Sequence, residues 1–247
     1  MFTNIIEIII LSIVQGVSEF LPISSSAHLN IVQIIFEFNS NSLMIDVSLH
    51  LGSLLAIVFY FRRELLDLRN NQKLLSLLII GSIPVVIAGY IFSSTGVINL
   101  LENNLMIIAW TTLIFGIILY LADKSKFDKK ISSNLNFKTI LYIGLFQILA
   151  LIPGVSRAGI TITAARLFRF NRFDSSKISF LLAIPAIAGA SVLQLKNAIG
   201  QNFELVHTLL SFHHLYFLHL KKLMVINLET QLTLRLGQKA CLQINYQ

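Results

Sequence analysis

Residues 139–168 read TILYIGLFQILALIPGVSRAGITITAARLF, an apolar segment with a break in its middle. Its apolar run Thr139–Leu151 stops at Pro153-Gly154 and resumes through Ala158–Phe168. Each half is shorter than the roughly 20 residues that cross a bilayer. Proline and glycine end one helix and allow another to begin. The stretch therefore predicts a re-entrant hairpin of two short helices, whose broken backbone must be covered by protein or by a water-filled cavity.

The composition places this hairpin in a membrane protein. Of the 247 residues, 55% are hydrophobic and only 13% are charged, whereas an ordinary soluble domain is about a quarter charged. The long Ile, Leu, Phe and Val runs do not alternate as the strands of a membrane barrel do. The single Cys241 excludes an internal disulfide and a cysteine-based metal cluster. We therefore predict an all-α, polytopic integral membrane protein and exclude a soluble domain, a disordered chain and a disulfide scaffold.

The basic residues fall between the apolar segments and predict the topology. They gather in the loops Arg62–Lys73, Lys124–Lys138 and Arg166–Lys177, whereas 93–104 has no Lys or Arg. Basic loops face the cytoplasm, so both ends of the 139–168 hairpin should lie inside. We assign the net charge of +7 to these loops and to membrane lipids with anionic headgroups, and we expect no nucleic-acid partner.

A second broken segment completes the pattern. Ile5–Val17 turns at Pro22 and resumes through Ala27–Phe38, and by counting loops both of its ends should lie outside. Two hairpins that enter from opposite sides are typical of an inverted repeat. The segments Leu21–Ala27 and Ile152–Ala158 resemble each other, which supports such a repeat.

The remaining apolar segments are candidate membrane spans, and they comprise Leu43–Phe61, Leu74–Phe92, Leu105–Leu121, Ile178–Leu195 and the histidine-rich Phe203–Leu220. We predict one membrane domain over 1–247. The first repeat occupies 1–122, an incomplete second repeat occupies 123–222, and an atypical tail occupies 223–247.

Ionisable side chains inside a membrane are costly and are therefore functional candidates. Glu19 is followed by Ser24, Ser25 and Ser26 and then by His28. A turn capped by serines would explain part of this pattern. A carboxylate, three hydroxyls and an imidazole so close together exceed what a turn needs, so we predict part of a functional site.

The second candidate group lies at the other turn. Arg157 follows Gly154 and Ser156 and begins the second half of the 139–168 hairpin. A snorkelling arginine is the alternative. Helix N-termini bind anions, the arginine fork matches phosphate oxygens, and a serine hydroxyl donates a hydrogen bond. This turn therefore predicts phosphate binding.

If the two turns meet, they form one site suited to a phosphate ester or a diphosphate. Gln15 lies one helical turn before Glu19, and the two would share a face and hold Mg²⁺ or Ca²⁺. A serine or a metal-bound water would attack phosphorus, and His28 would move the proton. We expect Asp46 and His50, which lie four residues apart, to serve packing or interhelical hydrogen bonds.

Two segments carry a family resemblance. Gln15–His28, QGVSEFLPISSSAH, and Pro153–Gly159, PGVSRAG, resemble the two signatures of the bacterial undecaprenyl-diphosphate phosphatases, the bacitracin-resistance family. Asp46–Gly52, DVSLHLG, is similar to a further segment of that family. The resemblance covers about residues 1–200, and the chain departs from the family pattern after about Leu205.

The resemblance implies an inner-membrane enzyme that recycles the cell-wall lipid carrier and confers bacitracin resistance. Such enzymes remove the terminal phosphate of undecaprenyl diphosphate with Mg²⁺ or Ca²⁺, at a site open to the periplasmic side. Family roles carried over here place Gln15 and Glu19 on metal or substrate. They place Ser25 and His28 in the chemistry, and Ser156 and Arg157 on the phosphates. Whether Ser25 or water is the nucleophile stays open, as does a homodimer.

An alternative function follows from the same pattern, because inverted repeats with broken helices are also typical of transporters. A lipid-carrier transporter or flippase would move its substrate without hydrolysing it. Release of inorganic phosphate distinguishes the two.

Overall fold

The computed structural model describes residues 2–38, 43–96, 104–124 and 128–199. Within these ranges the chain forms helices joined by turns, with an isolated bridge between Lys129 and Phe170 and no strand. The predicted all-α class is therefore confirmed. The predicted span Phe203–Leu220 and the tail at 223–247 lie outside the described residues.

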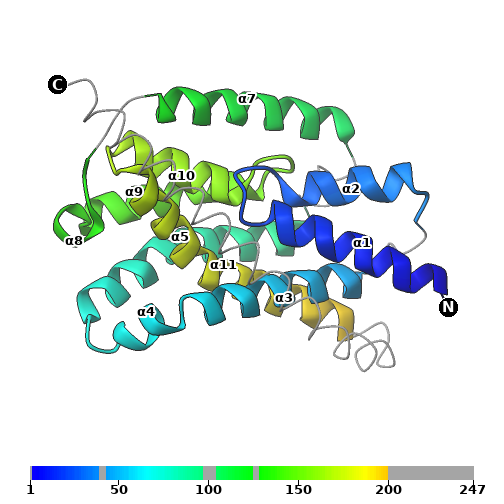
Figure 1. Ribbon diagram of the computed structural model, residues 1–247, viewed down its shortest axis with the longest axis horizontal. Coiled ribbons are helices and arrows are strands. Elements are labelled where there is room, and N and C mark those ends of the chain that lie inside the picture. Colours follow the sequence, from blue (N-terminus) through cyan, green and yellow to red (C-terminus); the bar gives the residue numbers. More distant parts are fainter. Residues whose placement is uncertain (1, 39–42, 97–103, 125–127, 200–247) are drawn as a thin grey trace, which may run out of the picture.

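The helices follow one another along the chain as Figure 1 shows. Their bounds are α1 Phe2–Ser18, α2 Ser25–Ile35, α3 Leu43–Tyr60, α4 Arg62–Asp67, α5 Gln72–Thr95, α7 Leu105–Asp123, α8 Ile131–Asn134, α9 Phe137–Gln147, the 3₁₀ helix η1 Ile148–Leu151, α10 Arg157–Leu167 and α11 Arg172–Ile199. The pairs α1–α2 and α9–α10 are the halves of the two predicted hairpins.

Three described helices are long and apolar enough to cross a bilayer, namely α5, α7 and the Arg172–Gln194 part of α11. They coincide with three of the predicted spans. A fourth predicted span, Leu43–Phe61, folds as α3, in which the apolar stretch Val47–Tyr60 is shorter.

The main core lies where α3, α5, α9, α10 and α11 pack together. A Cβ atom on Gly144 of α9 would collide with the backbone carbonyl oxygen of Gly81 in α5. Small residues at a crossing let two membrane helices approach closely. Leu182 of α11 also approaches Gly81, since a Cβ there would lie 3.0 Å from its Cδ2 atom. The helix α5 therefore packs closely against both α9 and α11.

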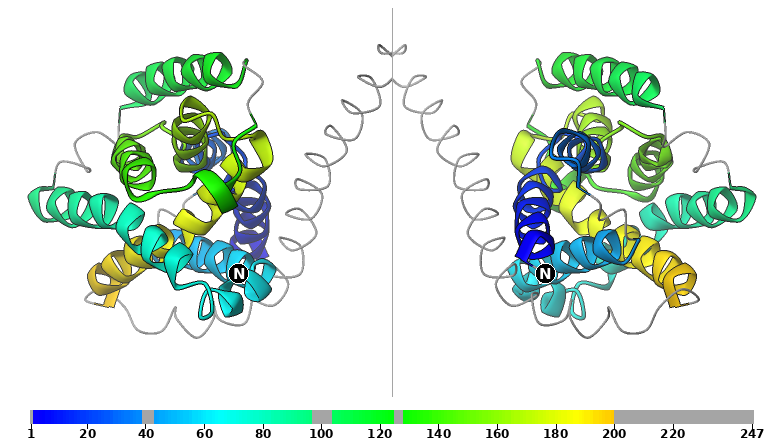
Figure 2. Two further views of the ribbon diagram at one scale, coloured as in Figure 1. Left: turned by 90° about the vertical axis from the view of Figure 1, so that its left-hand side faces the viewer. Right: turned by 90° about the vertical axis from the view of Figure 1, so that its right-hand side faces the viewer.

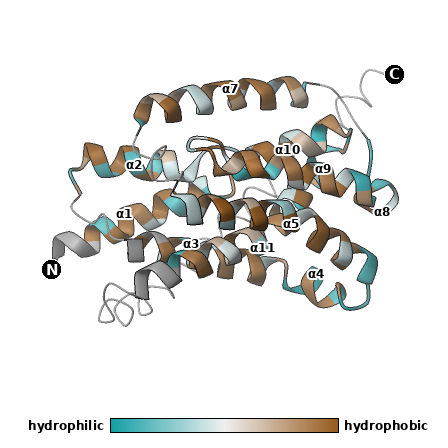
Figure 3. Cartoon of the chain, turned by 180° about the vertical axis from the view of Figure 1, so that it is seen from behind, coloured by the Kyte–Doolittle hydropathy of each residue, from teal (hydrophilic) through white to brown (hydrophobic). Residues whose placement is uncertain are grey.

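The outward face of α7 is apolar. This helix contacts α10, and the end-on views in Figure 2 show it along one side of the bundle. Its exposed large side chains include Met106, Trp110, Leu113, Ile114, Ile117, Tyr120 and Leu121. Figure 3 shows hydrophobic residues along most of this helix. An exposed apolar surface of this extent is suited to lipid contact.

The basic segments gather at the end of the molecule where α4 and α8 lie, which Figure 3 shows as its most hydrophilic end. Lys177 Nζ of α11 lies 3.6 Å from Glu64 Oε1 of α4. Arg172 donates from Nε and Nη2 to the Asp123 carboxylate at the end of α7, with an Nη2–Oδ2 distance of 2.7 Å. The predicted cytoplasmic loops therefore share one end of the fold, as the positive-inside rule requires of them.

The two helical hairpins open toward opposite ends of the molecule. In Figure 1, α1–α2 opens toward the chain's N-terminus and α9–α10 opens toward α8, with the two turns approaching each other between them. The inverted repeat itself stays a prediction. The re-entrant placement of the hairpins in a bilayer stays a prediction.

Candidate active site

The two hairpin turns meet, and an ion pair joins them. Arg157 Nη2 at the start of α10 donates to Glu19 Oε1 just after α1 over 2.7 Å. The carbonyl oxygen of Pro22 also lies against α10, 3.4 Å from where a Cβ on Gly159 would be. Residues 138 positions apart in the sequence are thereby placed in one site.

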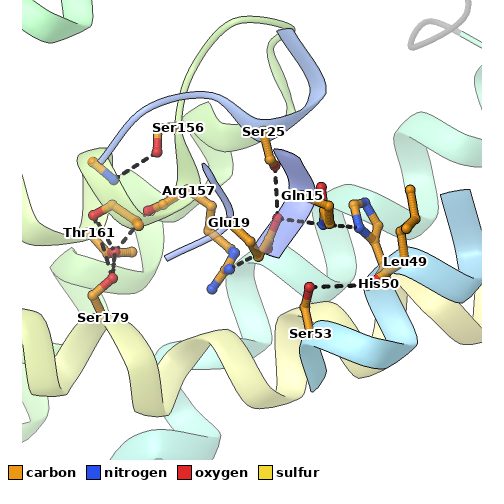
Figure 4. Close-up of polar contacts among 12 residues, drawn as sticks. Gln15, Glu19, Ser25, Leu49, His50, Ser53, Ser156, Arg157, Thr161 and Ser179 are labelled. Atoms are coloured by element: carbon orange, nitrogen blue, oxygen red, sulfur yellow. Dashed lines mark hydrogen bonds and ion pairs between the residues drawn. The ribbon is translucent and has the colours of Figure 1, made fainter. Parts of the chain in front are cut away.

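Glu19 is the centre of a polar network, drawn in Figure 4. Its Oε2 atom accepts from Gln15 Nε2 at 3.0 Å and from Ser25 Oγ at 2.8 Å, while Oε1 accepts from Arg157. The Glu19 side chain is only 8% exposed. A buried carboxylate needs a cation and hydrogen-bond donors of this kind, because burying a charge without partners is strongly unfavourable.

Serine caps place the key side chains at helix starts. Ser24 Oγ accepts from the backbone N–H of Ala27, which puts Ser25 at the first position of α2. Ser156 Oγ accepts from the backbone N–H of Gly159 at 3.1 Å, which puts Arg157 at the first position of α10. Capping uses the oxygen of each hydroxyl as an acceptor and leaves its hydrogen able to donate to an anion.

His28 and Ser26, both predicted site residues, lie beside this network rather than in it. His28 Nδ1 lies 2.6 Å from the Ser24 carbonyl oxygen. A carbonyl only accepts, so Nδ1 carries the hydrogen and Nε2 of the neutral ring is the acceptor. Ser26 is exposed, and its Oγ lies 3.2 Å from Ser24 Oγ. His28 is thus held to the start of its own helix through Nδ1.

His50 joins the network from α3. Its Nδ1 atom lies 2.7 Å from Gln15 Nε2, which confirms the predicted interhelical hydrogen bond. Sequence reasoning placed His50 outside the site because nothing in the spacing shows that α3 passes behind Gln15. The similarity of Asp46–Gly52 to a family segment was the available signal. The side chain of Asp46 lies outside the described set.

The second turn is held by two threonines that sequence reasoning missed. Thr111 Oγ1 of α7 donates to the Pro153 carbonyl oxygen at 2.6 Å, and Thr112 Oγ1 donates to the Gly154 carbonyl oxygen at 3.0 Å. Two adjacent hydroxyls in an otherwise apolar span were the signal that could have revealed them. Through these bonds α7 fixes the turn that carries Arg157.

Comparisons with known proteins identify the family of this chain. The family model described as "Bacitracin resistance protein BacA" matches residues 8–226. The chain belongs to this family. It is 91% identical over 218 residues to a protein named undecaprenyl-diphosphatase from Pelagibacter ubique (strain HTCC1062), covering 88% of this chain and 85% of that protein.

More distant family members are also named undecaprenyl-diphosphatase. The Elusimicrobium minutum (strain Pei191) protein is 43% identical over 201 residues, with 78% of this chain and 76% of that protein covered. The protein from Alteromonas mediterranea (strain DSM 17117 / CIP 110805 / LMG 28347 / Deep ecotype) is 41% identical over 212 residues, with 81% and 79% covered.

The BacA match extends one sequence prediction and supports another. It reaches residue 226, so the likeness to the family extends past Leu205 and past the 1–200 range that the motifs indicated. Together with the long apolar helices α5, α7 and α11, it makes the chain a multi-pass membrane protein.

The oxygen atoms at this site are enough to hold a divalent cation only if the substrate supplies further ligands. Among the described residues, no group of three or more His, Cys, Asp or Glu side chains is arranged to hold a metal. Gln15 Oε1 is buried without a hydrogen-bond partner, so it is one oxygen suited to a hard cation, and Glu19 offers the carboxylate. Mg²⁺ commonly binds through one or two protein oxygens together with substrate phosphates. Gln15 and Glu19 fit that pattern.

Gly154→Ala should destabilise the protein by about 2–5 kcal/mol. Gly154 has φ +87°, which favours glycine, and an added Cβ would collide with Thr111 Oγ1 and the Ile108 carbonyl oxygen. Chemical unfolding in detergent measures the change.

Two glycines provide matched controls for Gly154. Gly116 lies within α7, and a Cβ added there would meet nothing within 4 Å. Gly116→Ala should therefore leave the stability unchanged or improve it by up to about 1 kcal/mol. Gly96 has φ +70° but open space around it, so Gly96→Ala isolates the backbone cost. A Gly154→Ala protein as stable as the Gly116→Ala protein would show that the turn is not confined as described.

Proposed function

We propose that this chain hydrolyses undecaprenyl diphosphate to undecaprenyl phosphate and inorganic phosphate. The observation that carries the proposal is the Glu19–Arg157 ion pair, because it joins the two family motifs into one polar site inside an otherwise apolar bundle. The names of the relatives support this substrate. The product would return the cell-wall lipid carrier to use and would confer bacitracin resistance.

The second hairpin turn provides the phosphate-binding part of the proposed site. Arg157 presents a planar fork, and its guanidinium has donors beyond the one that Glu19 accepts. The first turn of α10 and the Ser156 hydroxyl add donors beside it, and Gly154 keeps the turn narrow. The first turn of α2, with Ser24 and Ser26, would complete the cradle from the other hairpin.

Glu19 would accept a proton from the nucleophile. Its Oε2 atom already accepts from Ser25 Oγ at 2.8 Å, so Ser25 is one candidate nucleophile, and a water in the same position is the other. In both cases attack on the terminal phosphorus breaks its bond to the bridging oxygen and releases undecaprenyl phosphate. A water nucleophile gives inorganic phosphate in that same step, whereas Ser25 would carry the phosphoryl group until a water hydrolyses it to inorganic phosphate. His28, with its Nε2 as acceptor, would move the proton on the α2 side.

A divalent cation, Mg²⁺ or Ca²⁺, would bind at Gln15 and Glu19 and would neutralise charge on the diphosphate. We place the protein in the bacterial inner membrane with this site open to the periplasmic side. Two observations support the orientation. The basic loops share the opposite end of the fold, and the α1–α2 hairpin opens away from them.

The purified protein should release inorganic phosphate from undecaprenyl diphosphate in detergent, and EDTA should abolish the release. Addition of excess Mg²⁺ or Ca²⁺ should restore it. Release that persists in EDTA would overturn the cation proposal and leave the hydrolysis. Movement of the lipid across vesicle membranes without phosphate release would instead favour the transporter alternative.

A further inference from the structure

His50 is a polar side chain that contacts the Glu19 network but has no role in the proposed hydrolysis. It lies on α3, is partly buried, and contacts the Gln15 amide nitrogen. Figure 4 shows its ring directed at the Gln15 amide from the side opposite Glu19. The question is what this contact does for the site.

The hydrogen-bond directions in this contact are fixed by Glu19. A carboxylate only accepts, so Gln15 must present its amide nitrogen, and not its amide oxygen, to Glu19 Oε2 at 3.0 Å. The amide nitrogen has a second hydrogen, which points to His50 Nδ1 at 2.7 Å. His50 Nδ1 is therefore the acceptor, and the hydrogen of the neutral ring is on Nε2.

This geometry decides where the Gln15 amide oxygen points. Gln15 is fully buried, and its Oε1 has no hydrogen-bond partner. A buried polar atom without a partner costs about 1–3 kcal/mol, so rotation of the amide toward another donor is favoured unless the nitrogen is held. Glu19 and His50 hold it from two sides.

We propose that His50 is a positioning residue of the active site. It holds the Gln15 amide so that the nitrogen supports the Glu19 carboxylate and the oxygen stays available as a ligand for the cation–diphosphate substrate. The proposal rests on the proposed function, since it assigns His50 a task toward Glu19 and Gln15. It requires an acceptor at the Nδ1 position and does not require the imidazole ring.

Two substitutions separate the acceptor from the ring. Asparagine at this position offers a carbonyl oxygen near the place of Nδ1, whereas leucine has a similar size and no acceptor. We expect His50→Leu to lower kcat by roughly tenfold to a hundredfold, the loss that corresponds to one hydrogen bond in a charged network. His50→Asn should stay within about threefold of the unchanged protein. The KM for undecaprenyl diphosphate should change less than kcat in His50→Leu.

Ser82→Ala is the matched control for removing a buried polar group. Ser82 is 4% exposed, lies on α5, and donates to the Leu78 carbonyl oxygen of its own helix. It should keep the normal kcat. Equal losses in His50→Leu and His50→Asn would overturn the proposal, because the ring and not the acceptor would then matter. A kcat within twofold of normal in His50→Leu would also overturn it.

A double-mutant cycle tests whether His50 acts through Gln15. Adding His50→Leu to a Gln15→Leu protein should cause no further loss of kcat. Independent, multiplying losses would overturn the proposal. The same cycle measured by thermal unfolding detects the Gln15–His50 contact without any catalysis. If the two substitutions are coupled in thermal unfolding but the protein releases no phosphate, the proposed function alone is refuted. If they are not coupled, the Gln15–His50 contact on which the inference depends is refuted.

Discussion

Glu19→Gln should reduce kcat/KM for phosphate release from undecaprenyl diphosphate by roughly a hundredfold to a thousandfold. Glutamine keeps the size of the side chain but removes the negative charge that Arg157 pairs with over 2.7 Å. It also replaces one of the two oxygens that accept from Gln15, Ser25 and Arg157 with an amide NH₂, which cannot accept. Breaking a buried ion pair by removing one partner costs about 3–5 kcal/mol, because the other charge stays buried without compensation.

The control for this substitution is a carboxylate outside the site. Glu64 is 41% exposed in its side chain and lies 3.6 Å from Lys177 at the basic end of the fold. Exposed ion pairs contribute about 0–1 kcal/mol, so Glu64→Gln should leave phosphate release unchanged. A folded Glu19→Gln protein that turns over as fast as Glu64→Gln would refute the central role of Glu19.

Arg157→Ala should lose most of the activity, and Arg157→Lys should restore little of it. Arginine presents a rigid fork of donors, one of which binds Glu19 while others remain for phosphate oxygens. Lysine keeps the charge but has no fork. We expect kcat/KM to fall by at least about a hundredfold in Arg157→Ala and by about tenfold or more in Arg157→Lys.

Arg172→Ala is the matched control, because Arg172 also binds a carboxylate, Asp123, but lies at the exposed end with its side chain 47% exposed. It should retain near-normal phosphate release. Thermal unfolding of each variant in detergent separates a lost fold from a lost function. Near-normal turnover by folded Arg157→Ala protein would show that the two hairpin turns do not form one site.

The helices and their breaks could be predicted from signals that are local in the sequence. Apolar runs interrupted by Pro22 and by Pro153-Gly154 mark the two hairpins, and both are helix pairs in the structure. The distribution of lysine and arginine predicted that three loops share one end, and they do. These features are local, because span length and helix-breaking residues can be read from neighbouring positions alone.

Sequence reasoning selected Gln15, Glu19, Ser25 and Arg157 because charged and polar residues stand out in an apolar chain. The structure brings these four into one hydrogen-bonded network. The donors that hold these residues in place were not selected. Thr111 and Thr112 fix the second turn from α7, and His50 supports Gln15 from α3. None of the three stands out from its neighbours in the sequence, because the role of each depends on a contact with a distant segment.

Composition and residue order were enough to predict a helical membrane protein, the positions where its helices break, and the polar groups that are costly in a membrane. The meeting of the two turns at Glu19 and Arg157, their support by His50 and α7, and the unpartnered Gln15 Oε1 follow from how the helices pack. The physical reason is range. Helix periodicity and hydropathy act over a few residues, whereas an ion pair between positions 19 and 157 depends on how helices cross, and that is set by close contacts such as Gly81 with Gly144.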